Sequence, residues 1–309
     1  MHILVTGGAG FIGSVLTPML LDAGHHVTVV DVLRSGGQGL LAYFHERRFR
    51  FVRGDVRDGE SMARLIAGAS AVVHLAAIVG FPACRKYPEL ARETNILGTR
   101  TVVEALHGDQ TLIYASSGSN YGIVEAALCT EESPLNPTSF YAVTKTEGEK
   151  ICLQRPRTTA LRFATAFGVS PRMRLDLLVN NFVHQAIVNK QLIVYERHFR
   201  RTFIAVRDIA RSIVFALDHI DQMSGEAYNI GHESMNFTKE QIALKIRECV
   251  PFYLHFADIG TDEDSRDYDV SYEKIRQLGY HPEVTIEAGI EELVRAVEVL
   301  DIADPYSNV

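Results

Sequence analysis

Short apolar runs alternate with segments of helical periodicity through the first half of the chain. Runs rich in Val, Ile and Leu without a polar face are typical of parallel strands that are buried on both sides. We predict such strands at residues 2–6, 26–31, 50–54, 71–75, 110–115 and 159–163, and helices at 11–24, 59–68, 89–107 and 137–154. This alternation indicates an α/β fold with a doubly wound parallel sheet and right-handed crossovers.

The second half has a less regular pattern. We predict helices at 175–190, 207–218, 238–249, 271–277 and 286–299, and short strands at 192–195, 202–206 and 226–230. No repeat or flexible linker separates the halves. We therefore expect a first domain at 1–168 and a smaller substrate-binding lobe at 169–309, with segments near 200–215 returning to the first domain.

Composition and charge exclude several classes of function. The chain has 309 residues, of which 47% are hydrophobic and 22% charged, as in an ordinary globular protein. A formal net charge of −7 gives no attraction to nucleic acid or to an acidic membrane. The amino terminus runs straight into a predicted strand, and no apolar stretch reaches 18 residues. We expect a cytoplasmic protein with no nucleic-acid or membrane partner.

The cysteines and histidines give no sign of a metal site. The four cysteines are scattered without metal-ligand spacing, which is typical of a reducing compartment, and the twelve histidines form no HxxxH array. We therefore predict no metal.

A glycine-rich turn follows the first predicted strand and opens the first predicted helix. It reads Thr6-Gly-Gly-Ala-Gly-Phe-Ile-Gly13. Gly7, Gly10 and Gly13 allow a tight turn, close approach of a pyrophosphate to the backbone, and close packing of helix on strand. The amino terminus of the helix then presents N–H groups and a partial positive charge to the phosphates. The motif predicts a dinucleotide site.

Asp31 supports this prediction, because it ends the second predicted strand 18 residues beyond Gly13. That is close to the spacing of a ribose-binding acid, and a carboxylate there repels a 2′-phosphate. NAD is therefore favoured over NADP. Two observations leave alternatives open: Arg34 could face a phosphate, and Asp31 could serve only as a turn or cap residue.

Tyr141 and Lys145 lie four residues apart in a predicted helix, so their side chains share one face. An ammonium close to a phenol favours the phenolate, which turns a weak acid into a usable general base. An exposed helical pair of the same spacing is common, so the pair alone does not establish a site. Ser116 and Ser117 follow the strand at 110–115, where a hydroxyl can reach the same edge of the sheet.

Together these residues resemble the extended short-chain dehydrogenase/reductase superfamily, in its NAD-dependent nucleotide-sugar epimerase/dehydratase family. The resemblance covers nearly the whole chain. Its motifs are the glycine turn, Gly54-Asp55-Val56, His74-Leu75-Ala76-Ala77, Asn95 with Gly98-Thr99, Ser116-Ser117, Tyr141 with Lys145, Leu161-Arg162, Tyr228-Asn-Ile-Gly231 and Leu278-Gly279-Tyr280. It implies a Rossmann-type sheet that binds NAD.

The resemblance also implies roles for single residues. Ser117 matches the catalytic hydroxyl, Tyr141 the base, and Lys145 the residue that also bonds the nicotinamide ribose. The cofactor set is Gly7, Gly10, Phe11, Ile12, Gly13, Asp31, Asp55, Val56, Leu75, Ala76, Ala77, Asn95, Ser116, Tyr141 and Lys145. His74 matches a position that is usually structural, so we expect a buried histidine.

The residues after Ser117 bear on the reaction. Relatives that eliminate water place Asp-Glu there, and relatives that decarboxylate a uronic acid usually have Glu at the position of Ser119; this chain has Gly118-Ser119. A UDP-glucose 4-epimerase type of site is favoured, acting by transient oxidation of a sugar hydroxyl, most plausibly at C4. A ketoreductase or an unusual dehydratase of the same fold, and a non-enzymatic dinucleotide-binding protein, remain alternatives.

The resemblance implies a nucleotide-diphosphate sugar as substrate and a homodimer formed through helices near 89–107 and 137–154. Arg201 and Arg266 match arginines that hold the diphosphate. The expected substrate set is Val79, Ser117, Ser119, Tyr141, Thr165, Asn180, Arg201 and Arg266. Thr165 and Ala205 replace the Asn and His of many relatives, which leaves the nucleobase and the sugar open. Cys84 is either an acid/base or, more commonly for a lone cysteine, an inert apolar residue.

Overall fold

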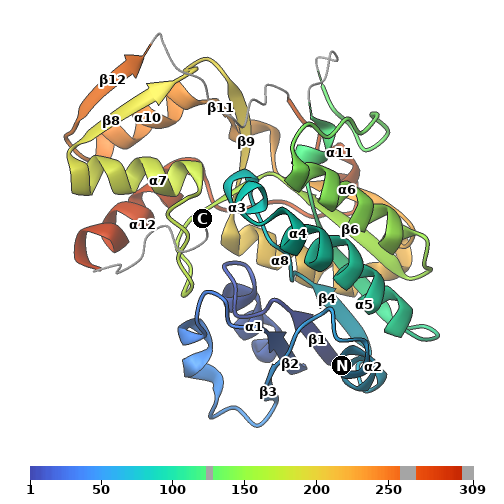
Figure 1. Ribbon diagram of the computed structural model, residues 1–309. Coiled ribbons are helices and arrows are strands. Elements are labelled where there is room, and N and C mark those ends of the chain that lie inside the picture. The colour runs from blue at the N-terminus through green and yellow to red at the C-terminus, as the bar shows by residue number, and fades with distance from the viewer. Residues whose placement is uncertain (123–127, 258–268, 301–309) are drawn as a thin grey trace.

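The computed structural model describes residues 1–122, 128–257 and 269–300. Its centre is a seven-stranded sheet in which every neighbouring pair of strands is parallel, in the order β10-β6-β5-β4-β1-β2-β3 (Figure 1). The strands are β1 (His2–Thr6), β2 (His26–Asp31), β3 (Phe49–Arg53), β4 (Ala71–His74), β5 (Thr111–Ser117), β6 (Thr158–Phe163) and β10 (Ala227–Ile230). The predicted doubly wound, Rossmann-type sheet is confirmed.

Helices cover both faces of this sheet. One face packs on α1 (Gly13–Asp22) and α8 (Val206–Asp218), and the other on α2 (Gly59–Ala67), α5 (Thr99–Ala105) and α6 (Phe140–Leu153). Successive residues of a strand point to opposite faces of the sheet and belong to different cores: Ile3 packs with α1 and α8, and Leu4 with α2, α5 and α6. Both kinds of position are therefore apolar, which explains the uninterrupted apolar runs in the sequence.

A second core lies beyond the carboxyl edge of the sheet. It is enclosed by α7 (Leu178–His184), which continues as a π-helical turn (Gln185–Asn189), and by α10 (Lys239–Cys249) and α12 (Ile286–Val299). Two small sheets flank these helices: β11 (Asn236–Thr238), β9 (Arg200–Ala205) and β7 (Thr165–Phe167) form one, and β12 (Tyr253–Ala257) and β8 (Gln191–Tyr195) the other.

The later part of the chain also returns to the first core. Residues of α8, α9 (Ile220–Met223), β10 and α11 (Glu273–Gln277) pack against the sheet helices. The two cores thus share chain segments, and the cleft between them is bounded by residues from both.

The helix predicted at 89–107 is interrupted. It consists of α4 (Pro88–Arg92), a π-helical segment (Glu93–Gly98) and α5, and it is preceded by α3 (Phe81–Lys86). Short 3-10 turns occupy Gln38–Tyr43, Gly118–Tyr121 and Glu233–Met235. Among the described residues, no helix is both long and apolar enough to cross a membrane.

Candidate active site

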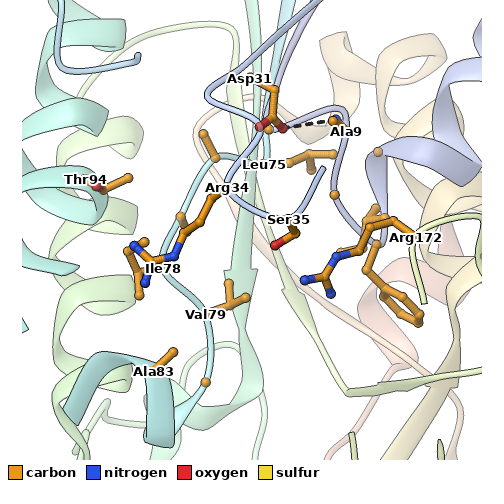
Figure 2. Close-up of a pocket in the computed structure, with 18 of the residues that line it drawn as sticks. Ala9, Asp31, Arg34, Ser35, Leu75, Ile78, Val79, Ala83, Thr94 and Arg172 are labelled. Atoms are coloured by element: carbon orange, nitrogen blue, oxygen red, sulfur yellow. Dashed lines mark hydrogen bonds between the residues drawn. The ribbon is translucent and has the colours of Figure 1, made fainter. Parts of the chain in front are cut away.

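A cavity of about 590 Å³ lies at the carboxyl ends of the parallel strands, the usual place for a ligand in a doubly wound sheet. Figure 2 shows Arg172 and Arg34 entering it from different elements. The predicted site residues that line it are Gly7, Gly10, Phe11, Ile12, Gly13, Asp31, Asp55, Val56, Leu75, Ala76, Ala77, Val79, Ser116, Ser117, Tyr141 and Thr165. Residues far apart in the sequence therefore form one site.

The glycine turn is built for close contact between backbones. Gly7 has φ +69°, and a Cβ atom on it would lie 2.7 Å from the Cα and N atoms of Ala76. Its N–H donates to the Val30 carbonyl at 2.8 Å. The glycine turn therefore packs directly on the segment that follows β4. The backbone of the turn lines the cavity.

Asp31 lies at the end of β2 with its carboxylate turned toward the glycine turn. It accepts hydrogen bonds from the Ala9 N–H at 3.1 Å (dashed in Figure 2) and from the Leu33 N–H at 2.8 Å. Burial raises the pKa of Asp31, and the two N–H donors and the charge of Arg172 oppose that rise. Each carboxylate oxygen keeps a lone pair for a ribose hydroxyl.

These features fit a dinucleotide. The Gly10–Gly13 segment opens α1 into the cavity, where anions are favoured, and Asp31 stands at the ribose position. Val56 is nearly buried beside it, whereas the Asp55 carboxylate is engaged by Arg57, 2.7 Å away, which holds the pKa of Asp55 below its usual range.

Ser117 and Tyr141 meet the cavity from β5 and from α6. The Ser139 hydroxyl accepts the Ala142 N–H at 3.2 Å and so begins α6, which places Tyr141 in the first helical turn. The Ser117 Oγ lies 2.7 Å from the Ser119 Oγ. A phenol and a hydroxyl thus line one cavity, as the sequence predicts.

Lys145, four residues after Tyr141 on α6, is only 4% exposed and does not line the cavity. Its Nζ atom sits 4.2 Å from the ring centroid of Tyr114, whose π face stabilises a cation. Burial lowers the pKa of Lys145 to about 8. Lys145 lies one helical turn after Tyr141 on α6, so a basic side chain is present in the helix that carries the phenol.

Asn95 does not line the cavity, although its sequence position suggested a cofactor contact. Its Oδ1 accepts the Ile78 N–H at 2.7 Å, and its Nδ2 donates to the Ile78 carbonyl at 2.9 Å and to the Thr144 hydroxyl at 2.9 Å. It thereby ties the segment after β4 to the first turn of α6. Asn95 holds two walls of the site together.

His74 is the buried residue that the sequence predicted. Its Nδ1 lies 2.7 Å from the Thr6 hydroxyl and its Nε2 3.0 Å from the Thr99 hydroxyl, and burial lowers its pKa to about 3. The Thr6 hydroxyl also accepts the Ala76 N–H at 3.2 Å. His74 therefore supports the cavity wall from behind in its neutral form.

This neutral histidine predicts a stability difference between pH 7 and pH 5. The unfolded chain protonates a histidine near pH 6.5 but the folded chain only near pH 3, so stability falls as pH drops through this window. We expect the loss of unfolding free energy from pH 7 to pH 5 to be smaller in His74→Gln by about 2 kcal/mol. Urea unfolding at both pH values measures this.

The matched control is His45→Gln, which removes an exposed side chain. It should leave the difference between the two pH values unchanged within about 0.5 kcal/mol. Equal acid sensitivity of His74→Gln and the parent chain would show that His74 is not the group responsible.

Besides Asn95, four predicted residues that the structure describes do not line the cavity. Ser119, which is bonded to Ser117, is buried, as is Lys145 of α6. Asn180 is fully buried and bonds the Gly168 N–H and carbonyl at 2.9 and 3.0 Å, so it shapes a turn. Arg201 is buried on β9. Arg266 lies outside the described residues.

Sequence reasoning did not assign Arg172 or Arg174 to the site, although both line the cavity. Arg172 is 8% exposed, and Arg174 pairs with Asp176 at 2.5 Å. The run Pro171-Arg-Met-Arg174, which carries two arginines just before the helix predicted at 175–190, was the available signal. Residues that follow β7 thus contribute positive charge to a cavity in a chain of negative net charge.

Cys84 is fully buried beside the cavity. Its Sγ donates to the Ile78 carbonyl at 3.3 Å, and burial raises its pKa to about 12. A thiol held protonated in this way acts as an apolar residue. No cluster of metal-ligating side chains occurs within 1–122, 128–257 and 269–300.

Comparison with known proteins agrees with this geometry. The sequence model of the NAD dependent epimerase/dehydratase family matches residues 3–231. The chain is 32% identical to a dTDP-glucose 4,6-dehydratase of Streptomyces niveus over 95% of this chain and 92% of that protein. It is 31% identical to an uncharacterised UDP-glucose epimerase of Bacillus subtilis over 94% and 96%.

Solved structures show the same similarity. A UDP-glucuronic acid 4-epimerase from Bacillus cereus, in complex with UDP-glucuronic acid and NAD, superposes with a TM-score of 0.86 at 26% identity, over 96% of this chain and 99% of that one. A dTDP-glucose 4,6-dehydratase from Streptomyces venezuelae, with NAD bound, gives 0.83 at 28%, over 96% of each.

Proposed function

Because this chain belongs to the NAD dependent epimerase/dehydratase family, we propose that it is a nucleotide-sugar epimerase that inverts one carbinol carbon, C4 being favoured. The prediction of NAD as cofactor is confirmed by this family. The relatives include both epimerases and dehydratases, so the choice between these reactions depends on the residues around Ser117 and Tyr141.

The proposed reaction removes a proton and a hydride from one carbinol and returns both to the opposite face of the resulting ketone. NAD, when bound, supplies the site that takes and returns the hydride. Tyr141 takes the hydroxyl proton as phenolate and later gives it back, while Ser117 hydrogen-bonds the reacting oxygen. The Lys145 ammonium stabilises the phenolate.

One observation carries the choice of epimerisation. Among the described residues that line the cavity, the carboxylates are Asp31, which ends β2, and Asp55, which follows β3. Ser117 and Tyr141 stand at β5 and α6, on the other side of β1 and β4 in the sheet. Elimination of water needs a further acid and base beside the sugar. Ser119, where an acid would serve, is a buried hydroxyl bonded to Ser117.

The test is proton NMR of the protein incubated with UDP-, GDP-, CDP-, ADP- and dTDP-sugars. New anomeric signals without net change in NADH are expected. Loss of the 6-hydroxymethyl signals would instead identify a dehydratase, and net consumption of NADH a ketoreductase. Turnover of none of these sugars contradicts the proposed function.

We also propose a homodimer, formed through α6 and the helical segment that precedes it. Leu97 is 41% exposed, Phe140 39% and Val143 37%, on elements that pack side by side. Large apolar side chains gathered on one surface are typical of an interface. The family resemblance of the sequence implies pairing through the same helices.

We expect Leu97→Asp combined with Val143→Asp to give a monomer, because two charges would be buried in the interface. Sedimentation equilibrium measures the mass. The control is Ile193→Asp, equally exposed at 45% but on β8 of the other lobe, which should leave the mass unchanged. A parent chain that sediments as a monomer contradicts the proposal.

A further inference from the structure

Glu149 is a buried carboxylate on α6 that no step of the proposed reaction uses. It is 2% exposed and shares its helix with Tyr141 and Lys145. Arg162 of β6 faces it, and the guanidinium Nη2 lies 2.6 Å from the Glu149 Oε1, with both side chains nearly inaccessible. The ion pair therefore lies inside the protein, beneath the end of β5.

The same carboxylate holds the end of β5. The Ser116 hydroxyl donates to the Glu149 Oε2 at 2.5 Å. The Asn120 amide donates to that oxygen at 3.2 Å and to the Ser116 hydroxyl at 3.0 Å. Residues before and after Ser117 are thus bonded to one carboxylate.

Arg162 extends these contacts one residue further. Its Nη1 donates to the Tyr121 hydroxyl at 2.9 Å, and that hydroxyl donates to the Asn229 Oδ1 at 2.7 Å. Segment 116–121 is therefore fixed to α6, β6 and β10 at three of its residues. Ser117 lies within this segment and has extended backbone angles, φ −148° and ψ 139°.

Such fixing matters because a hydroxyl that bonds a reacting oxygen must keep its position within a few tenths of an ångström. Ser117 is the last residue of β5, and the pairing of β5 with β6 ends there. The pairing of β5 with β4 has already ended at Tyr114. Hydrogen bonds to an ionised carboxylate are about twice as strong as neutral ones, and Arg162 supplies the charge that makes burial of the carboxylate tolerable.

We infer that Glu149 is a positioning residue for Ser117, acting through the Ser116 hydroxyl and neutralised by Arg162. One carboxylate then ties the helix that carries the base to the strand that carries the hydroxyl. This inference rests on the proposed function, in which the Ser117 hydroxyl must be positioned to bond the reacting oxygen.

The test separates the hydrogen bond between Ser116 and Glu149 from the ion pair between Glu149 and Arg162. Ser116→Ala removes the hydroxyl and leaves Glu149 and Arg162 paired, so the chain should fold. We expect kcat for the nucleotide sugar to fall about tenfold or more, with KM within about twofold. Ser116→Thr keeps the hydroxyl and should retain at least about half of the parent kcat. Glu149→Gln, which strands Arg162, should lower both kcat and thermal stability.

The control is Asp208→Asn, which alters another buried carboxylate. Asp208 accepts the Glu283 and Val284 N–H groups at 3.1 and 2.9 Å, away from Ser117. It should lower thermal stability and leave kcat within about twofold. Ser116→Ala with the kcat of the parent chain overturns the inference. So does Ser116→Thr impaired as much as Ser116→Ala, because volume rather than the hydroxyl would then decide.

Hydrogen–deuterium exchange gives a readout that needs no turnover. In Ser116→Ala we expect faster exchange at residues 115–121 and nowhere else, whereas unchanged exchange there overturns the inference. If the parent chain turns over no nucleotide sugar, the proposed function fails. The exchange measurement still decides whether the hydrogen bond between Ser116 and Glu149 holds residues 115–121 in place.

Discussion

Replacing Tyr141 with phenylalanine is expected to lower kcat by about 10³-fold while bound NAD is retained. The change deletes one oxygen atom from a side chain that lines the cavity, and with it the proposed proton acceptor. General base catalysis by a positioned side chain contributes about 10²–10⁴-fold. The glycine turn and Asp31, which make up the cofactor end of the cavity, are untouched. Steady-state kinetics and the NAD content of the purified variant measure the two effects.

Tyr253→Phe is the matched control, because Tyr253 is 67% exposed on β12 of the other lobe. It should keep the parent kcat. A Tyr141→Phe variant that turns over at the parent rate would remove the phenol from the mechanism. Loss of NAD together with activity would instead assign Tyr141 chiefly to cofactor binding.

A second large effect is expected from Gly13→Ala. A Cβ atom on Gly13 would lie 2.4 Å from the Cα and 2.6 Å from the carbonyl oxygen of Gly8, and backbone atoms cannot move aside as a flexible side chain does. The start of α1 must therefore shift away from the turn. We expect a loss of about 1–3 kcal/mol of unfolding free energy from overpacking. We also expect NAD affinity to fall about 100-fold as the helix N–H groups leave their phosphate positions.

Calorimetric titration with NAD and urea unfolding measure these losses. Gly59→Ala is a close control, because Gly59 also opens a helix, α2, and a Cβ atom there meets nothing closer than the Thr101 methyl group at 3.8 Å. That variant should bind NAD as the parent does. Equal NAD affinity of the two variants would mean that the close approach at Gly13 does not shape the site.

The sheet and the glycine turn could be predicted because each leaves a local mark, whereas the roles of Ser117 and Tyr141 followed from the resemblance to the family. Strands buried on both faces require continuous apolar runs, and the turn requires glycine where a backbone passes within contact distance. The start of α6 is likewise marked by a capping serine, Ser139. These features depend on residues adjacent in sequence.

Other features depend on distant contacts and left no such mark. The π-helical turn at Glu93–Gly98 lies inside a segment predicted as a regular helix, and its Asn95 is bonded to the Ile78 segment, which no local pattern reveals. The strand β12, which pairs with β8, was missed because it is not one of the continuous buried apolar runs. Asn180 was expected at the substrate because it lies near the start of a predicted helix over the cleft, and Ser119 because relatives place a reacting acid there. Their hydrogen bonds instead go to a neighbouring turn and to Ser117.

The pairing of β10 with β6 has a practical consequence for dissecting the molecule. Ala227–Ile230 hydrogen-bonds alongside Ala160–Phe163, more than sixty residues earlier in the chain. A fragment that stopped at residue 168 would present the bare edge of β6, rich in apolar residues, to any other copy in solution, and such edges promote aggregation. The nucleotide-binding half is therefore a poor choice for recombinant expression by itself, and biophysical work should begin from the intact polypeptide.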